Sequence, residues 1–199
     1  FVALERGGSL LAYDPQQGID VLPVADSVTW RKPQAIGGYF GNLYVLDPLL
    51  NRILKYVPTD NVYTNPPSDY LSPQLEVDLT GAVDMAIDGN VYVLFADGRI
   101  LKFFNGEPRP FTMDGLPTPM RSPTTVVVGG PQDPEAEGYV YVTDAGNERI
   151  VQFDKAGGFV RQLQAKSGEP QLRNLRGIYV DEQRGSIFIL SGRTLWLAD

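Results

Sequence analysis

Short apolar runs separated by turn residues recur along the whole chain. Within many of these runs, apolar and polar residues alternate, as in antiparallel strands that bury one face. No helical stripe persists beyond two turns, so the pattern predicts an essentially all-β chain. One type of run recurs among similar neighbouring residues and begins with an aromatic residue followed by Val or Ile. It occurs at residues 1–4, 44–47, 92–95, 141–144 and 188–191.

The first residues of these runs are 43 to 49 positions apart. A period near 47 is typical of one propeller blade and differs from the periods of ankyrin, TPR and leucine-rich repeats. Each aromatic run would be the second strand of a blade. The fourth strands are expected at residues 18–24, 74–79, 109–113 and 159–163. The sequence thus predicts a β-propeller of four-stranded antiparallel blades, a single domain over 1–199 with about five repeats at 1–24, 33–79, 82–113, 123–164 and 175–199.

A second pattern follows the aromatic runs: an Asp, a short turn with Asn or Gly, and an Arg that opens the next strand. An Asp carboxylate can satisfy the N–H groups of such a turn, and the Arg can fix the strand register through a charge-assisted hydrogen bond. A ligand site would not recur from blade to blade, so we interpret the pattern as structural. Its members are Asp47, Asn51, Arg52, Asp97, Arg99, Asp144, Asn147 and Arg149.

The segment 144–153 resembles the signature of NHL repeats, in which Asp, Asn, Arg-Ile and an aromatic residue have this spacing. Residues 47–56 match it nearly as well, 97–103 form a shortened version, and 191–196 and 5–13 keep only the outline. The resemblance implies an NHL-like propeller, commonly six-bladed, similar to the sensor domains of bacterial signalling proteins. The chain would supply 18 strands where five full blades need 20. Strands beyond its ends would complete a larger ring, or an imperfect ring would expose edges that allow a homodimer.

The amino-acid composition limits the partners and the catalytic groups that this chain can use. The net charge is −7 and the pI about 4.6, which disfavours nucleic acid as a partner. No apolar run approaches the length of a membrane span. The chain has neither Cys nor His, so thiolate chemistry, the commonest general base and the commonest transition-metal ligand are missing. We therefore expect no enzyme, cofactor or metal. Carboxylates at strand ends are the candidates for a Ca²⁺ alternative: Asp84, Asp88, Asp97, Asp144, Asp154 and Asp181.

Basic residues gather in the connections that lead into the first strand of a blade. In a propeller those loops converge on the channel mouth, where ligands commonly bind. A ring of Arg there would hold a carboxylate or phosphate through bidentate hydrogen bonds. Alternatively, these side chains solvate the loops or pair with neighbouring Asp residues. We call the set the collar: Trp30, Arg31, Lys32, Arg121, Arg173 and Arg176.

Three functions are compatible with this sequence. We favour a non-catalytic recognition or scaffolding propeller within a larger signalling or surface protein, with a protein or a small anionic ligand as its partner. The alternatives are a carboxylate- or Ca²⁺-dependent hydrolase or lyase and a purely structural repeat domain.

Overall fold

The computed structural model describes residues 2–4, 10–26, 29–60, 62–167, 169 and 172–198. Phe1, which opens the first predicted run, and residues 5–9, which hold the faintest copy of the Asp–Arg pattern, lie outside the described residues. The chain divides into two compact units, one of residues 1–80 with 105–107 and one of residues 81–104 with 108–199. The fold is all-β in both units.

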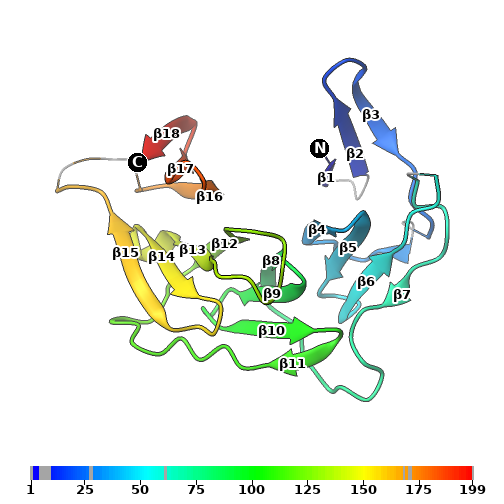
Figure 1. Ribbon diagram of the computed structural model, residues 1–199, viewed down its shortest axis with the longest axis horizontal. Helices are drawn as coiled ribbons and strands as arrows, with labels where there is room; N and C mark the ends of the chain where they lie inside the picture. Colours follow the sequence, from blue (N-terminus) through cyan, green and yellow to red (C-terminus); the bar gives the residue numbers. More distant parts are fainter. Residues whose placement is uncertain are drawn as a thin grey trace. The chain divides into compact units, whose positions relative to one another are not determined.

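The first unit contains two antiparallel sheets (Figure 1). Their strands are β1 (Val2–Leu4), β2 (Leu10–Asp14) and β3 (Gly18–Leu22), followed by β4 (Ala35–Tyr39), β5 (Asn42–Asp47), β6 (Arg52–Tyr56) and β7 (Ser68–Asp69). Each strand pairs with the next one along the chain, so every sheet is a simple meander. Leu10 of the first sheet packs against Leu43, Val45, Leu54 and Tyr56 of the second.

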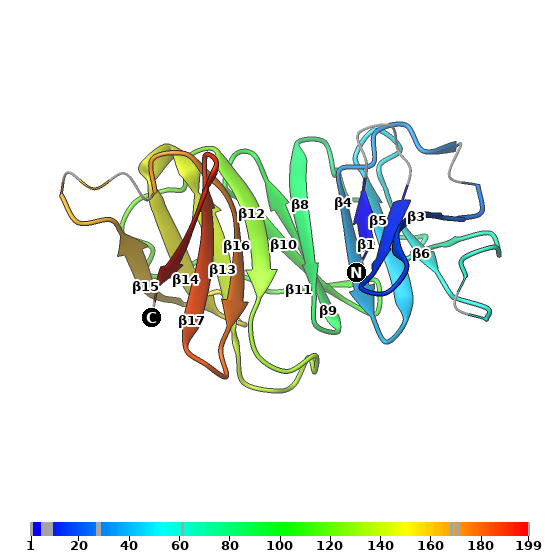
Figure 2. The ribbon, with the colours of Figure 1, turned by 90° about the horizontal axis from the view of Figure 1, so that it is seen from above.

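The second unit contains three more meanders. Their strands are β8 (Ala82–Ile87), β9 (Asn90–Phe95), β10 (Ile100–Phe104) and β11 (Glu107–Arg109); β12 (Pro123–Val128), β13 (Tyr139–Asp144), β14 (Arg149–Asp154) and β15 (Phe159–Gln164); and β16 (Leu175–Asp181), β17 (Ser186–Ser191) and β18 (Thr194–Ala198). A 3-10 turn, η2 (Ala145–Asn147), joins β13 to β14. The first strands β8, β12 and β16 lie side by side (Figure 2).

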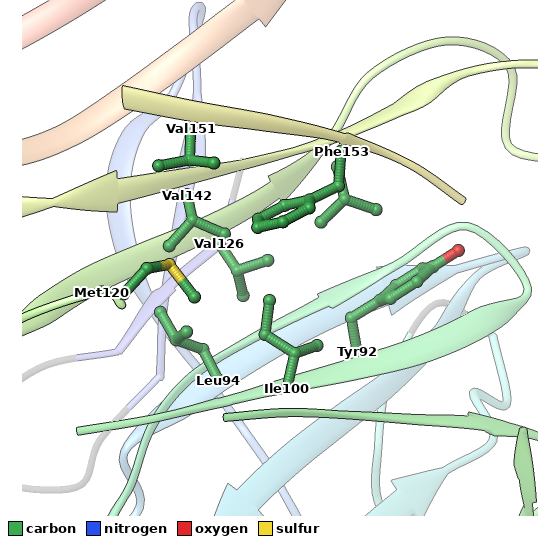
Figure 3. Close-up of a cluster of buried hydrophobic side chains, with 9 residues drawn as sticks. Tyr92, Leu94, Ile100, Met120, Val126, Val142, Val151 and Phe153 are labelled. Atoms are coloured by element: carbon green, nitrogen blue, oxygen red, sulfur yellow. The ribbon is translucent and has the colours of Figure 1, made fainter. Parts of the chain in front are cut away.

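Neighbouring sheets of the second unit pack face against face. Tyr92 and Leu94 of β9 meet Val142 and Phe153 of the next sheet in one apolar cluster (Figure 3). β9 is buried along its whole length. The predicted half-buried alternation therefore does not hold for this strand.

Two predicted outer strands are displaced. The second sheet closes with β7 at Ser68–Asp69 rather than at residues 74–79, and there Asp69 forms an ion pair with Arg52 of the adjacent strand β6. In the third sheet, β11 ends at Arg109, since Pro110 has no N–H to continue a ladder. The apolar side chain of Phe111 instead packs into the cluster between the sheets.

The last sheet has one covered and one uncovered face. Ile187 and Ile189 point toward the preceding sheet and are buried there. On the opposite face, Tyr179, Leu195 and Leu197 remain 64%, 65% and 57% exposed. The register aligns these positions with residues that the next sheet covers in the preceding meander. The exposed face of β16–β18 is thus apolar, like a sheet face that packs against another sheet.

Candidate functional site

A buried carboxylate anchors the loop that leads into β4. Asp47, at the end of β5, is fully buried, and its carboxylate accepts the backbone N–H of Arg31 at 2.6 Å and of Lys32 at 3.0 Å. It also accepts the N–H groups of Leu49 and Leu50 in the following turn, at 3.1 and 3.2 Å. One side chain therefore ties the collar loop to the turn between β5 and β6 and fixes where Arg31 and Lys32 leave the backbone.

Asp144 holds the corresponding loop before β12. Its carboxylate accepts the backbone N–H of Arg121 at 2.7 Å and the side chains of Asn147 and Arg149, both at 2.7 Å. Arg149 also donates to the carbonyl of Thr118 at 2.6 Å. The ion pair is almost fully buried, with 0% of Asp144 and 2% of Arg149 exposed, so it joins the loop, the turn and β14 in one network.

The other repeats keep parts of this arrangement. Ser191 replaces the Asp in the last sheet, and its hydroxyl accepts the N–H of Asn174 at 3.4 Å. In the third repeat, Asp97 turns outward and pairs with Arg99 at 2.7 Å on the surface. The loop before the strand is then tied by a backbone bond, from the N–H of Ala96 to the carbonyl of Gly81 at 2.9 Å.

In the second repeat, Asn51 and Arg52 make separate contacts. The side-chain amide of Asn51 donates to the carbonyl of Val77 at 2.8 Å and accepts the N–H of Leu79 at 2.7 Å. Arg52 forms an exposed ion pair with Asp69. All eight residues of the Asp–Arg pattern are therefore engaged within the protein, six of them with the backbone of a loop or turn: Asp47, Asn51, Asp97, Asp144, Asn147 and Arg149.

The collar residues differ in their surroundings. Trp30 is buried in the core of its unit and donates its Nε1–H to the Tyr56 hydroxyl at 2.8 Å, so its ring is not presented at a rim. Arg31 and Lys32 belong to the first unit and the three remaining arginines to the second. In the second unit, Arg121 precedes β12 and Arg176 lies at the start of β16, its neighbour.

The described basic side chains differ in their partners. Within the described residues, those of Arg52, Arg99, Arg149, Lys155 and Arg184 form ion pairs with Asp residues. The collar side chains form none in that part of the chain, and all of them are exposed: Arg31, Lys32, Arg121, Arg173 and Arg176. Asp47 and Asp144 hold the backbone N–H groups of Arg31, Lys32 and Arg121, while their guanidinium and ammonium groups face solvent. This arrangement suits them to an external anion.

One carboxylate lies on a first strand itself. Asp84 of β8 accepts the N–H of Val126 in β12 at 2.8 Å and so links two neighbouring sheets. Burial raises the pKa of Asp84 from 3.8 to about 6, despite the opposing effect of this hydrogen bond.

Asp84→Asn gives a pH-dependent gain in stability. The raised pKa means that ionisation costs more in the folded than in the unfolded chain, so Asp84 destabilises the fold progressively as the pH rises from about 4 to above 6. The amide variant keeps an acceptor for Val126 but carries no charge. In urea denaturation, we expect similar stability to the wild type near pH 4 and higher stability at pH 7. An identical difference at both pH values would show that Asp84 does not titrate in this way.

The remaining carboxylates are dispersed. No group of three or more His, Cys, Asp or Glu side chains suited to a metal gathers within the described ranges. Asp88 instead forms a buried pair with Lys155 at 2.7 Å. The sequence did not single out Lys155, because its partner is 67 positions away and only the stacking of two sheets brings them together. No helix in the described part of the chain has the length and apolar character needed to cross a membrane.

The chain is similar in structure to several solved propellers and propeller-containing complexes. A nidogen/laminin complex matches with a TM-score of 0.64 at 13% identity, over 96% of this chain and 69% of that one. The WD40 β-propeller domain of Doa1 matches at 0.60 and 13%, over 100% and 60%. A streptogramin B lyase matches at 0.58 and 16%, over 92% and 55%. No family model and no curated protein matches the chain.

These likenesses show the fold alone, since all three identities are below 20%. Together with the stacked four-stranded meanders they establish a β-propeller architecture, as the repeat period predicts. The chain spans little more than half of the lyase and about two thirds of the nidogen/laminin match.

Proposed function

We propose that this chain is a non-catalytic recognition propeller whose exposed collar arginines in the second unit bind an anionic partner, with Arg121 and Arg176 as the central pair. The observation that carries this proposal is the contrast between held backbones and unpaired side chains. Asp144 fixes the N–H of Arg121, yet no carboxylate in the described chain neutralises its guanidinium. A domain of net charge −7 has many carboxylates available, so the exposed arginines are arranged for an acceptor from outside.

The partner class that we favour is a protein segment rich in acidic side chains. Two of the similar structures are complexes with proteins, nidogen with laminin and BBS1N with ARL6DN. A propeller fold supports many functions, so these likenesses raise the expectation of a protein partner without identifying it. The resemblance of residues 144–153 to NHL repeats supports a place in a larger signalling or surface protein.

An enzymatic function is the weaker candidate. A similar structure is a virginiamycin B lyase, in a form named as catalytically inactive after replacement of a histidine. The present chain contains no histidine at all. A lyase-type role on this propeller would therefore need a different general base.

We further propose that the five meanders are consecutive blades of one NHL-like propeller domain over residues 1–199. Propellers of NHL repeats commonly form a six-bladed ring. The exposed apolar face of β16–β18 supports a further blade next to it. The Asp, Arg-Ile and aromatic positions that residues 47–56 share with residues 144–153 support common repeat identity.

Charge reversal tests the collar. We expect the double variant Arg121→Glu/Arg176→Glu to weaken binding of a hexaglutamate peptide by at least about tenfold at low ionic strength, because two charge-assisted contacts become repulsive. Isothermal titration calorimetry measures the affinity. Arg184→Glu is the matched control, since Arg184 lies in the turn at the opposite end of β16 and β17 and already pairs with Asp181. Equal affinity of the wild type and the double variant would refute the proposal.

A further inference from the structure

A groove lies between the last two sheets of the second unit, at the end of the strands opposite the collar. Its volume is about 470 Å³, within the range of sites for small ligands and short peptide segments. One wall comes from β13, β14 and β15, and the other from β16, β17 and the turn between them. Its lining is Tyr139, Tyr141, Gln152, Val160, Arg161, Val180, Asp181, Glu182, Gly185 and Ile187.

A chain of hydrogen bonds crosses this groove in one direction. Arg161 donates its Nε–H to the side-chain oxygen Oε1 of Gln152 at 2.5 Å. The Gln152 amide donates to the Tyr141 hydroxyl at 3.0 Å, and that hydroxyl donates to Glu182 Oε1 at 3.1 Å. Every donor points toward Glu182, so a fixed positive end and a fixed negative end face the same groove.

The repeat explains why the chain of bonds occurs in this blade. At the register position of Gln152, the second and third repeats carry Lys55 and Lys102. Both lysines lie over the tyrosine ring across the strand pair, at 5.8 and 5.5 Å from its centroid. The neutral Gln152 instead bonds the Tyr141 hydroxyl, which leaves no ammonium group here to neutralise Glu182.

The two charged side chains at the ends of the groove, Arg161 and Glu182, can form further polar contacts. Arg161 is exposed, and in the described part of the chain only its Nε makes a hydrogen bond. Glu182 is half-buried and receives the tyrosine hydroxyl, but no basic side chain of the described chain forms an ion pair with it. Between the two ends, Tyr139 and Val160 are 39% and 44% exposed and offer an apolar surface.

We propose that this groove binds an extended peptide segment of a partner protein that carries one basic and one acidic side chain. The basic side chain pairs with Glu182 and the acidic one with Arg161, while the backbone between them lies on Tyr139 and Val160. The opposite charges at the two ends impose a direction on the bound segment. The site is independent of the collar, which lies at the other end of the same strands.

The probes are capped pentapeptides and hexapeptides of alanine with one Lys and one Glu, separated by one, two or three residues. Chemical-shift titration of the isotopically labelled 199-residue chain measures binding. We expect one spacing to bind best, with shifts confined to the groove. Glu182→Gln keeps the acceptor for Tyr141 and removes the charge, and Arg161→Leu removes the other end. Each substitution is expected to weaken the best peptide by about tenfold.

Two controls separate this site from the collar and from unfolding. The Arg121→Glu/Arg176→Glu variant should bind the best peptide like the wild type, whatever its behaviour toward hexaglutamate. Replacing the peptide's Lys by norleucine should abolish the effect of Glu182→Gln. Arg161 is exposed, so Arg161→Leu tests the idea even if Glu182→Gln alters the fold. Absence of binding by every peptide at millimolar concentration, or equal affinity of wild type and both variants, would overturn the proposal.

Discussion

Asp144→Ala is expected to lower the free energy of unfolding by about 3–5 kcal/mol, because it leaves the buried Arg149 guanidinium without its counter-charge. The same change removes the acceptor of the Arg121 N–H and of the Asn147 side chain. Each of those groups is then left unsatisfied or must be solvated by a local opening of the loop. Urea denaturation followed by tyrosine and tryptophan fluorescence measures the loss.

Asp97→Ala is the matched control, since it deletes the Asp of the same pattern one repeat earlier. The side chains of Asp97 and Arg99 are 56% and 54% exposed, so water replaces their interaction at little cost. We expect a loss below about 1 kcal/mol. Similar losses in the two variants would mean that the pattern contributes through local turn geometry and not through the buried network.

Ile150→Ala is expected to cost about 2–5 kcal/mol, the usual range for a large aliphatic side chain removed from a packed core. Ile150 is fully buried between the sheets of β12–β15 and β16–β18, in contact with the cluster that contains Ile187 and Ile189. The cavity left between two stacked sheets cannot collapse easily, because both backbones are fixed by their ladders. Denaturation midpoints and slopes of the variant and the wild type measure the difference.

Leu195→Ala provides the comparison, because Leu195 occupies the position of Ile150 one repeat later. Unlike Ile150, its side chain is 65% exposed. We expect the substitution to change stability by less than about 0.5 kcal/mol. A loss as large as that of Ile150→Ala would show that the outer face of β16–β18 is covered in solution.

Much of the fold could be predicted from the sequence because a propeller repeats one local strand pattern along the chain. The aromatic-Val or aromatic-Ile run predicts the second strand of the four later sheets, β5, β9, β13 and β17, and the Arg-Ile run predicts the third strand of three of them. These strands lie in the middle of a meander. The outer strands could not be placed as well. They carry few buried side chains, so their position depends on contacts such as Asp69 with Arg52 that no periodicity encodes.

The candidate site was predicted in part. Collar arginines could be found because they recur just before a first strand, whereas burial of Trp30 depends on a partner hydroxyl 26 positions away. The groove was missed for a similar reason. Gln152 in place of a lysine is the one local signal for it, and Glu182 comes from a different repeat. Side chains that act across two sheets leave no spacing pattern in a single sequence.

The central claim is that buried residues at the ends of the second strands hold the collar loops from within. Amide hydrogen exchange of the Arg121 N–H, followed by NMR, tests this most directly. Because that N–H donates to fully buried Asp144, it should exchange only through large-scale opening, far more slowly than solvent-exposed loop amides. Exchange of the Arg121 amide at the rate of an exposed loop would contradict the account.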